Sequence, residues 1–482
     1  MHRASTLIQV VSEGDGHLQI TKKSSNVAVK STTTKSSQKS IRTITIEEVE
    51  AANTERKPWV AIRGKVYDLT NLLDKHPGGQ EMLLLAAGRD ATAMYESMHT
   101  DKNTKVLNKY VIGNLKKSNM PQFAERSQFS IEVEQRVLQY FKNKGIDPRH
   151  APGMVIIYTF LGLVFAASFL GMFSERASQI NFLLPWFSAL VMGWCCAMMG
   201  FYHLHDGCHG AFSRNPTNWS ILRRIYECLT GLSTTVWIYQ HGFGHHPFTN
   251  VVGIDPDILS ADPGIMRVHE DQPWWDFYGL QKYYWLPLYS QLVLSRKCFE
   301  WMDVFYYRAH KNIPINPPTW TEMAWGATTM SVYVAHHFIL PLFVFKISII
   351  RLILLHTISD LTWSLYLTLI FQASHVNDEV AWPKPNEDGL ITADWAKLQV
   401  EASLDFAHDD AMTTFLCGSL NYQAVHHLFP YVCQWHYPAI APIVKDACKK
   451  HGVRYNLKDS IWGMIGAHIK RINLFAEPPT LR

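Results

Sequence analysis

Four long apolar stretches constrain the fold of this chain most strongly. Residues 154–173 contain no charged side chain, and residues 182–202 form another long uncharged stretch. A helix of about 20 such residues crosses the roughly 30 Å hydrocarbon core of a bilayer. A second pair is expected at residues 325–345 and 349–371, although Asp360 interrupts it. We therefore expect about four membrane-spanning helices, arranged as two hairpins.

The composition limits the classes of partner. Charged residues make up 18% of the chain, below the roughly 25% of a typical soluble domain. The net charge of +4 is too small to indicate nucleic-acid binding. The eight cysteines show no paired spacing and are expected to be reduced thiols. Residues 1–42, rich in Ser, Thr and Lys, are predicted to be a disordered tail.

A haem-binding pattern follows this tail. Residues 43–118 alternate short apolar strands with helical segments, which predicts a small α+β domain. His76 opens the sequence His76-Pro77-Gly78-Gly79, and His99 follows 23 residues later. An electron-transfer haem needs two axial imidazoles, and two loops can deliver them. The domain resembles the cytochrome b5 family, and the resemblance implies that His76 and His99 ligate the haem iron. The alternative is a surface turn that happens to contain histidine.

Three further histidine clusters lie near the apolar stretches. In order, they contain His205 and His209; His241, His245 and His246; and Gln423, His426 and His427. On a helix, a spacing of four places His205 and His209 near one metal, and likewise His241 and His245. Adjacent histidines point about 100° apart and can serve two metals. Neutral imidazoles suit iron, zinc or copper.

These clusters resemble the three histidine boxes of membrane fatty-acid desaturases, over roughly residues 150–470. Gln423, in place of the first histidine of the third box, narrows the resemblance to front-end desaturases. Those enzymes insert a double bond between an existing one and the carboxyl end of the chain. The family also has a histidine outside the boxes, for which His375 is the candidate. His203, His336 and His337 are interpreted as structural.

The resemblance implies an α+β cytochrome b5-like domain at residues 43–118 and a linker at 119–150. An all-α membrane desaturase domain with a cytosolic histidine-rich cap is expected at 151–475. Box one has Leu204 where glutamine is frequent, and box three has Ala424-Val425 before its histidine pair. These variants favour the delta-5 and delta-4 branch. Delta-5 is the expected position, with delta-4, delta-6 and delta-8 left open.

The resemblance also implies cofactors and partners. These are haem b, two non-haem iron ions, O2, and NADH-derived electrons delivered by cytochrome b5 reductase. No catalytic residue is expected beyond the metal ligands. The substrate is a fatty acyl chain carried by coenzyme A or a phospholipid. The expected location is the endoplasmic reticulum membrane, with the active site on the cytosolic side.

Two alternatives remain open from the residues alone. A sphingolipid desaturase or a lipid hydroxylase would use the same boxes, because desaturation and hydroxylation share one type of iron oxidant. A membrane-anchored cytochrome b5 electron carrier would need haem iron only. Its histidine clusters would then be structural or would bind zinc.

Overall fold

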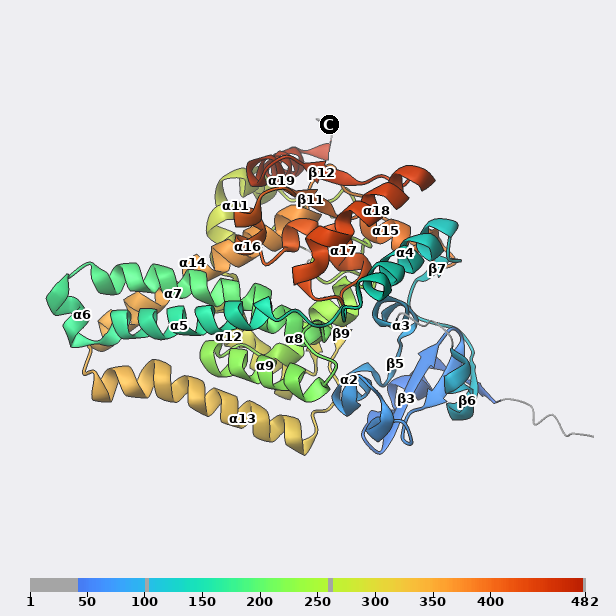
Figure 1. The fold of residues 1–482 in the computed structure, drawn as a ribbon, viewed down its shortest axis with the longest axis horizontal. Helices are drawn as coiled ribbons and strands as arrows, with labels where there is room; N and C mark the ends of the chain where they lie inside the picture. The colour runs from blue at the N-terminus through green and yellow to red at the C-terminus, as the bar shows by residue number, and fades with distance from the viewer. Residues whose placement is uncertain (1–41, 100–103, 259–262, 480–482) are drawn as a thin grey trace, which may run out of the picture. The chain divides into compact units, whose positions relative to one another are not determined.

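The computed structural model describes residues 42–99, 104–258 and 263–479 (Figure 1). The tail expected at residues 1–42 lies, apart from its last residue, outside these ranges. From residue 41 onward the chain forms one compact unit.

The α+β domain is built on a six-stranded sheet of order β1-β6-β4-β3-β2, with β5 added to β3. β3 pairs with β4 in antiparallel register, Val60 opposite Tyr67 and Ala61 opposite Val66. Side chains alternate between the two faces of a strand, so Val60 and Tyr67 enter one core while Ala61 and Val66 enter another. The strands are Thr43–Ile44 (β1), Asn53–Thr54 (β2), Lys57–Ile62 (β3), Lys65–Asp68 (β4), Arg89–Asp90 (β5) and Val111–Leu115 (β6).

Short helices carry the haem-ligand candidates out of this sheet. His76 lies just before α2, and His99 directly follows α3. Gly79 starts α2 with φ +82°, a left-handed conformation that favours glycine. The helices of this domain are Ile46–Glu50 (α1), Leu73–Lys75 (η1), Gly79–Ala86 (α2), Thr92–Met98 (α3) and Thr104–Tyr110 (η2).

Residues 119–150, expected as a linker, are folded. They contain the strand Gln122–Ala124 (β7), which pairs with Leu390–Asp394 (β10), and the helix Gln128–Lys144 (α4). Phe129, Val133, Val137 and Phe141 recur at helical spacing, and this stripe packs on the helix Tyr437–His451 (α18). The apolar stripe explains why the segment folds against the rest of the chain.

Four helices are long and apolar enough to cross a membrane: Gly153–Phe173, Leu184–His209, Trp320–Val344 and Ile349–His375. The expected number and hairpin arrangement are therefore confirmed. The second and fourth helices extend beyond the expected limits, so that they carry His205, His209 and His375. The charge of Asp360 in the fourth helix is compensated by Lys297, whose Nζ lies 2.8 Å from its carboxylate.

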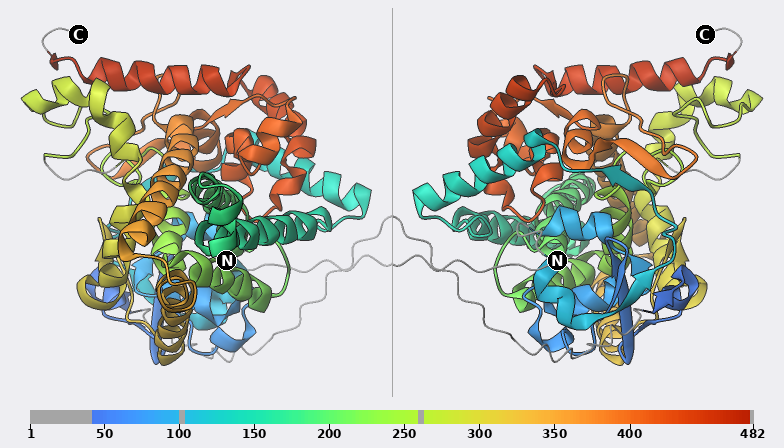
Figure 2. Two further views of the ribbon diagram at one scale, coloured as in Figure 1. Left: turned by 90° about the vertical axis from the view of Figure 1, so that its left-hand side faces the viewer. Right: turned by 90° about the vertical axis from the view of Figure 1, so that its right-hand side faces the viewer.

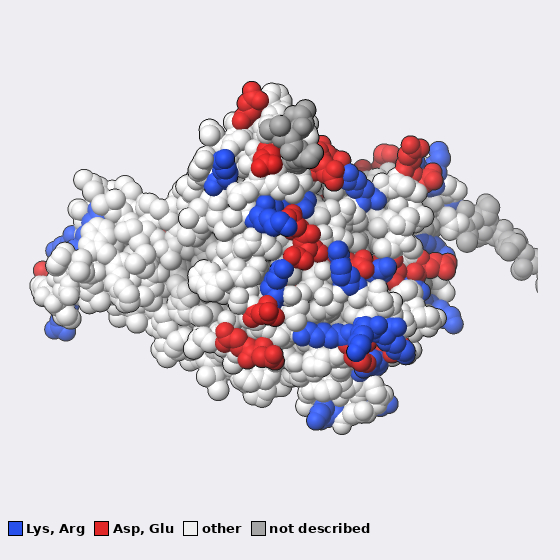
Figure 3. Space-filling view, turned by 90° about the horizontal axis from the view of Figure 1, so that it is seen from above, with Lys and Arg blue, Asp and Glu red and all other residues white. Residues whose placement is uncertain are grey.

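The second helix is central to this bundle. It consists of Leu184–Met199 (α7), a π-helical turn Gly200–Leu204 (η3) and His205–His209 (α8). α7 packs against Gly153–Phe173 (α5) and Ile349–His375 (α14). Trp320–Val334 (α13) and its π-helical continuation Ala335–Val344 (η7) are the least buried. Figure 3 shows that the face of the bundle seen from above carries few charged side chains except near its far end.

The remaining elements form a cap beside the bundle. Figure 2 shows α18 and α19 (red) lying away from the haem domain (blue). The first membrane hairpin turns through Glu175–Ile180 (α6). The helices of the cap are Pro216–Thr230 (α9), Thr234–Trp237 (α10), Ile238–His245 (η4), Asp276–Leu280 (η5), Gln281–Tyr289 (α11), Leu292–Met302 (α12), Asp303–Tyr307 (η6), Trp395–Glu401 (α15), Ala411–Leu416 (α16), Leu420–Tyr422 (η8), Gln423–Leu428 (α17), Gln434–His436 (η9), α18 and Ile461–Phe475 (α19). Short strand pairs join Ala309–His310 (β8) to Ile313–Pro314 (β9), and Leu404–Phe406 (β11) to Asn456–Lys458 (β12).

The crossing of α7 and α14 gives a testable prediction. A Cβ atom at Gly193 would collide with the Ser359 carbonyl and lie 2.8 Å from Thr362 Cβ. Gly193→Ala should therefore force the helices apart, at a cost of about 1–3 kcal/mol. The detergent-solubilised protein should lose its monodisperse gel-filtration peak at a lower temperature. Gly162→Ala is the matched control, because nothing lies within 4 Å of its Cβ position; equal melting of the two variants would contradict the close crossing.

Candidate metal centre and haem site

Box one lies where the second membrane helix ends. His205 and His209 occupy the two ends of α8, one turn apart, and both are buried. Their ring centroids are 4.7 Å apart, as the spacing of four predicts. Gly210 then ends the helix with φ +62°.

Box two lies on a π-helix, and this changes which of its histidines meet. The backbone N–H of His246 donates to the carbonyl of His241, at 2.9 Å, which is an i→i+5 bond. The Nε2 atoms of these two residues lie 3.0 Å apart. His241 and His245, which were predicted to reach one metal, do share a group of possible ligands with Asp257, but each has a closer histidine partner elsewhere. The wider turn pairs His241 with His246 and directs His245 toward His375 and His427.

Box three begins the short helix α17, and its adjacent histidines separate as expected. Nε2 of His426 lies 3.1 Å from Nε2 of His205 in box one. Nε2 of His427 lies 3.2 Å from Nε2 of His375, at the end of α14. The histidine outside the boxes is therefore brought to the centre by the fourth membrane helix.

Together, the eight histidines form two adjoining groups of possible metal ligands. One consists of His205, His209, His241 and His426; the other consists of His245, His375 and His427. His246 lies between them, within ligand distance of both His426 and His427. Two imidazole nitrogens bound to one metal at about 2.1 Å lie roughly 3 Å apart, as the pairs here do. A buried set of imidazole donors suits a transition metal such as iron.

The opposite ring nitrogens of several histidines are held by neighbouring groups. The Nδ1–H of His245 donates to Asp255 at 2.9 Å, and that of His375 to the Ala402 carbonyl at 3.1 Å. His427 Nδ1 lies 3.0 Å from Gln399 Oε1, and His426 Nδ1 lies 3.2 Å from the Tyr437 hydroxyl. Such bonds fix the tautomer and leave Nε2 available as a ligand.

The electrostatic surroundings keep most of these rings neutral. Burial holds the pKa values of His241, His246, His426 and His427 well below the usual range. The neutral form is the one that binds metal. Burial acts the same way on His245, but the carboxylates of Asp255 and Asp257 outweigh it and raise its pKa to about 9. These carboxylates would make His245 a more basic ligand once a metal displaces the proton.

Gln423 is the first residue of α17 and is buried. Its side chain interacts with His375. Its Oε1 atom makes no hydrogen bond to any described residue. A buried amide oxygen without a partner is costly, so a metal or a metal-bound water would satisfy it.

The histidines interpreted as structural lie outside the ligand groups. His203 is buried and its ring is 4.8 Å from that of Tyr158. His337 Nε2 lies 3.0 Å from the carbonyl of Leu229, and His336 Nδ1 lies 2.7 Å from that of Val332. None of these three histidines belongs to a cluster of possible ligands within the described residues.

The haem-ligand candidates face each other across a separate site. The ring centroids of His76 and His99 are 6.0 Å apart, which leaves room for a metal between two axial imidazoles at about 2 Å each. Their Nδ1 atoms lie against the carbonyls of Gly79, at 3.4 Å, and Tyr95, at 3.1 Å. Both rings therefore have the orientation that leaves Nε2 for iron.

The residues that orient the ligand rings were not predicted from the sequence. Asp255 was detectable in principle, since it lies in an Asp-Pro-Asp segment ten residues after His245. Gln399 lies 28 residues before His427 and Tyr437 lies 11 residues after His426, and neither stands in a recognisable motif. Only the packing of α15 and α18 on α17 brings them to the site.

Comparisons with known proteins agree with this architecture. The fatty acid desaturase family matches residues 181–458, and the cytochrome b5-like haem/steroid-binding domain family matches residues 45–116. The chain is 38% identical to an acyl-lipid (8-3)-desaturase of Mortierella alpina, over 91% of this chain and 98% of the relative. It is 35% identical to Delta(5) fatty acid desaturase A of Dictyostelium discoideum, over 90% and 93%.

A third relative is the acyl-lipid (8-3)-desaturase of Physcomitrium patens, 34% identical over 91% of this chain and 92% of that protein. The histidine groups, the four long helices and these matches lead to one assignment. The chain belongs to the fatty acid desaturase family and carries a cytochrome b5-like domain ahead of its membrane domain.

Proposed function

We propose that this protein is a front-end desaturase that introduces a cis double bond into a polyunsaturated acyl chain, at the delta-5 position. The main observation behind the proposal is the set of eight buried histidines, in two adjoining groups, at the end of the membrane bundle. The names of two relatives, an acyl-lipid (8-3)-desaturase and a Delta(5) fatty acid desaturase, support the proposed position. The head group carrying the acyl chain is proposed to be coenzyme A or a phospholipid.

The two histidine groups are proposed to hold two iron ions, with Gln423 as a further contact. Iron there would supply, together with O2, the oxidising power needed to remove hydrogen from unactivated methylenes. The protein positions the ligand rings and excludes water from the centre. Asp255, Gln399 and Tyr437 hold ligand rings in place, and burial keeps bulk water from the centre.

His76 and His99 are proposed to hold haem b. A haem with two axial histidines transfers electrons and leaves no open position for O2. Electrons are proposed to come from NADH through cytochrome b5 reductase. Fusion to the membrane domain raises the effective concentration of the haem near the iron centre.

The alternatives require different metals or products. A sphingolipid desaturase or hydroxylase would modify another lipid or yield a hydroxylated product. An electron carrier would contain one haem iron per chain and no other iron. Two convergent ligand groups, each with three or four buried imidazoles, favour the enzyme.

Product analysis tests the proposed activity. Yeast expressing the chain and fed polyunsaturated acids that lack a delta-5 double bond should accumulate their delta-5 products. His427→Ala should abolish the product while keeping the haem spectrum, because it removes a ligand candidate from one group. His76→Ala should lose that spectrum and slow product formation. Hydroxylated or sphingoid products, or none from any acid, would reject the proposal.

Gln423 provides a sharper test of the metal site. Gln423→Ala should lower turnover at least tenfold, because the buried oxygen near His375 is removed. Gln423→Glu keeps an oxygen at that position and should retain bound iron. Iron per chain is measured alongside the rate, with about three expected in the wild type. Wild-type turnover in Gln423→Ala would show that the residue only packs the start of α17.

We place the histidine centre on the cytosolic face of the endoplasmic reticulum. Both membrane hairpins turn at the far end of the bundle, and the chain segments outside it lie together with the histidines. Tags after residue 118 and after residue 475 should therefore both be cleaved by protease added to intact microsomes. A tag inserted between α13 and α14 should be protected. Protection of the C-terminal tag would contradict four spans with this orientation.

A further inference from the structure

The haem domain rests on the membrane domain through contacts at both ends of α2. This helix starts three residues after His76, so whatever fixes α2 also fixes a haem-ligand loop. At its start, Arg223 of α9 donates two hydrogen bonds to Glu81, at 3.0 and 2.6 Å. At its end, the Asn316 amide donates to the carbonyls of Leu84 and Ala87, at 2.7 and 2.9 Å.

The Arg223–Glu81 pair is unlike a surface ion pair. The Arg223 side chain is only 1% exposed, and that of Glu81 is 26% exposed. A bidentate arginine–carboxylate contact fixes the orientation of the two groups as well as their distance. Removing Glu81 would leave the buried Arg223 charge without this partner, whereas Glu81 also lies 3.6 Å from Arg224. The contact is therefore expected to hold one relative orientation of the two domains.

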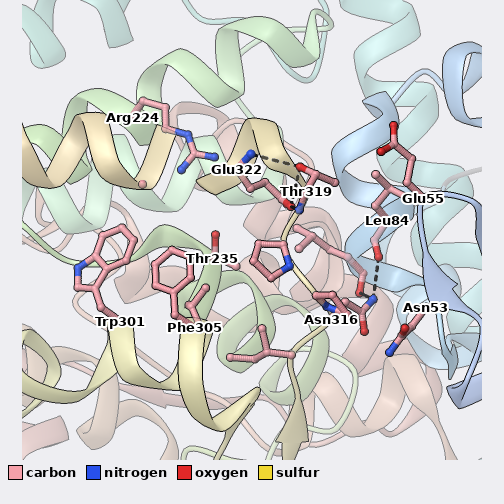
Figure 4. Close-up of a pocket in the computed structure, with 16 residues that line it drawn as sticks. Asn53, Glu55, Leu84, Arg224, Thr235, Trp301, Phe305, Asn316, Thr319 and Glu322 are labelled. Atoms are coloured by element: carbon pink, nitrogen blue, oxygen red, sulfur yellow. Dashed lines mark hydrogen bonds between the residues drawn. The ribbon is translucent and has the colours of Figure 1, made fainter. Parts of the chain in front are cut away.

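Asn316 acts on the other end of α2. The last carbonyls of a helix lack partners within the helix, and a side chain from the membrane domain supplies them here. Figure 4 shows Asn316 and its bond to Leu84 beside a cavity of about 30 Å³, which residues of both domains line. The packing is therefore close around Asn316. At the start of α2 the two domains are less closely packed, because Glu81 and Arg223 line a larger hollow of about 720 Å³.

Arg223 and its neighbour Arg224 also contact the elements that carry boxes one and two. A Cβ atom at Gly207, between the two box-one histidines, would lie 2.8 Å from Arg223 Cγ. Arg224 pairs with Glu227 at 2.7 Å, and Glu227 accepts a hydrogen bond of 2.8 Å from the backbone of Thr234, which starts α10. α10 leads directly into η4 and box two.

Arg89, in the strand that follows α2, reaches box two itself. Its guanidinium lies 4.9 Å from the ring centre of Tyr239 and 5.5 Å from that of Phe243, both on η4. It also donates to the Asn316 side chain at 3.1 Å. The haem domain thus contacts the helix that carries His241 and His245.

The other haem-ligand candidate faces box three. His99 lines a cavity of about 20 Å³ together with Leu428 and Phe429, which directly follow His427. One haem ligand is thus tied to boxes one and two through α2, while the other lies beside the end of box three. Electron transfer slows steeply with separation, so this orientation favours transfer.

We propose that Arg223, through Glu81, and Asn316, through the end of α2, are positioning residues that lock the haem domain in its electron-donating orientation. The proposal rests on the proposed function, since it assumes electron flow from the haem to the histidine centre. Neither residue touches the reacting atoms. Their effect would be on the rate of electron delivery, with haem and iron content unchanged.

The test uses the full-length protein with its haem and iron. The haem is reduced, mixed with O2 and the acyl substrate, and its reoxidation is followed by absorbance. Autoxidation is subtracted with a His427→Ala sample. Arg223→Glu and Glu81→Arg should each slow reoxidation at least tenfold, and the double variant should return to within about threefold of wild type. Asn316→Leu should slow reoxidation independently.

Arg214→Ala is the matched control. Arg214 is 74% exposed and pairs with Asp147 of segment 119–150, away from the Arg223–Glu81 contact, so its loss should leave the rate unchanged. Wild-type reoxidation in both single variants would overturn the proposal. So would a double variant that stays slow while keeping its haem spectrum and iron content.

Hydrogen exchange in α2 separates this proposal from the proposed function. Amide exchange should rise in each single variant and return toward wild type in the double variant. If the wild type makes no desaturated product but this pattern appears, the function is wrong and the docking stands. If product forms and α2 exchange does not respond to either single change, the docking is wrong and the function stands.

Discussion

The convergence of buried imidazole nitrogens at the end of a membrane bundle is the constraint on which the rest of this structure depends. Three pairs of Nε2 atoms lie 3.0 to 3.2 Å apart, although they come from four separate segments of the chain. Uncompensated, such a cluster would be costly to bury. Hydrogen bonds from the far side of several rings offset part of this cost, and a metal bound on the near side would offset more. The four segments that carry the ligand candidates, α8, η4, the end of α14 and α17, are placed so that their histidines reach this centre.

Helix geometry distributes the ligands between the two groups. In α8 an ordinary turn aligns residues four apart, so His205 and His209 act together. In η4 the wider π-helical turn aligns residues five apart, which joins His241 to His246 and releases His245 to the second group. Adjacent histidines in α17 separate for the reason expected of any helix. One chain segment can therefore supply both groups without a break in its backbone.

The haem domain adds a second requirement, that of orientation. A flexible fusion would raise the local concentration of the electron donor but would leave its direction free. The buried contact of Arg223 with Glu81 and the capping of α2 by Asn316 restrict that freedom. Segment 119–150 also restricts the orientation of the haem domain, because α4 packs on α18 and does not form a free linker. The connection between the two domains is thus folded along most of its length.

Much of this was determined by the sequence alone. Long uncharged stretches require membrane helices, since only such helices satisfy their backbone in lipid, and the spacing in box one requires a shared face. The sequence also identified all eight histidines as candidate ligands, including His375, which lies outside the three boxes. Only the tertiary structure decided the division into groups, because the π-helical turn of η4 has no local signature. It alone brought Asp255, Gln399 and Tyr437 to their rings and Arg223 to Glu81. These partners lie on different elements, from 10 residues apart for Asp255 and His245 to 142 for Arg223 and Glu81, and the packing of those elements sets their distances.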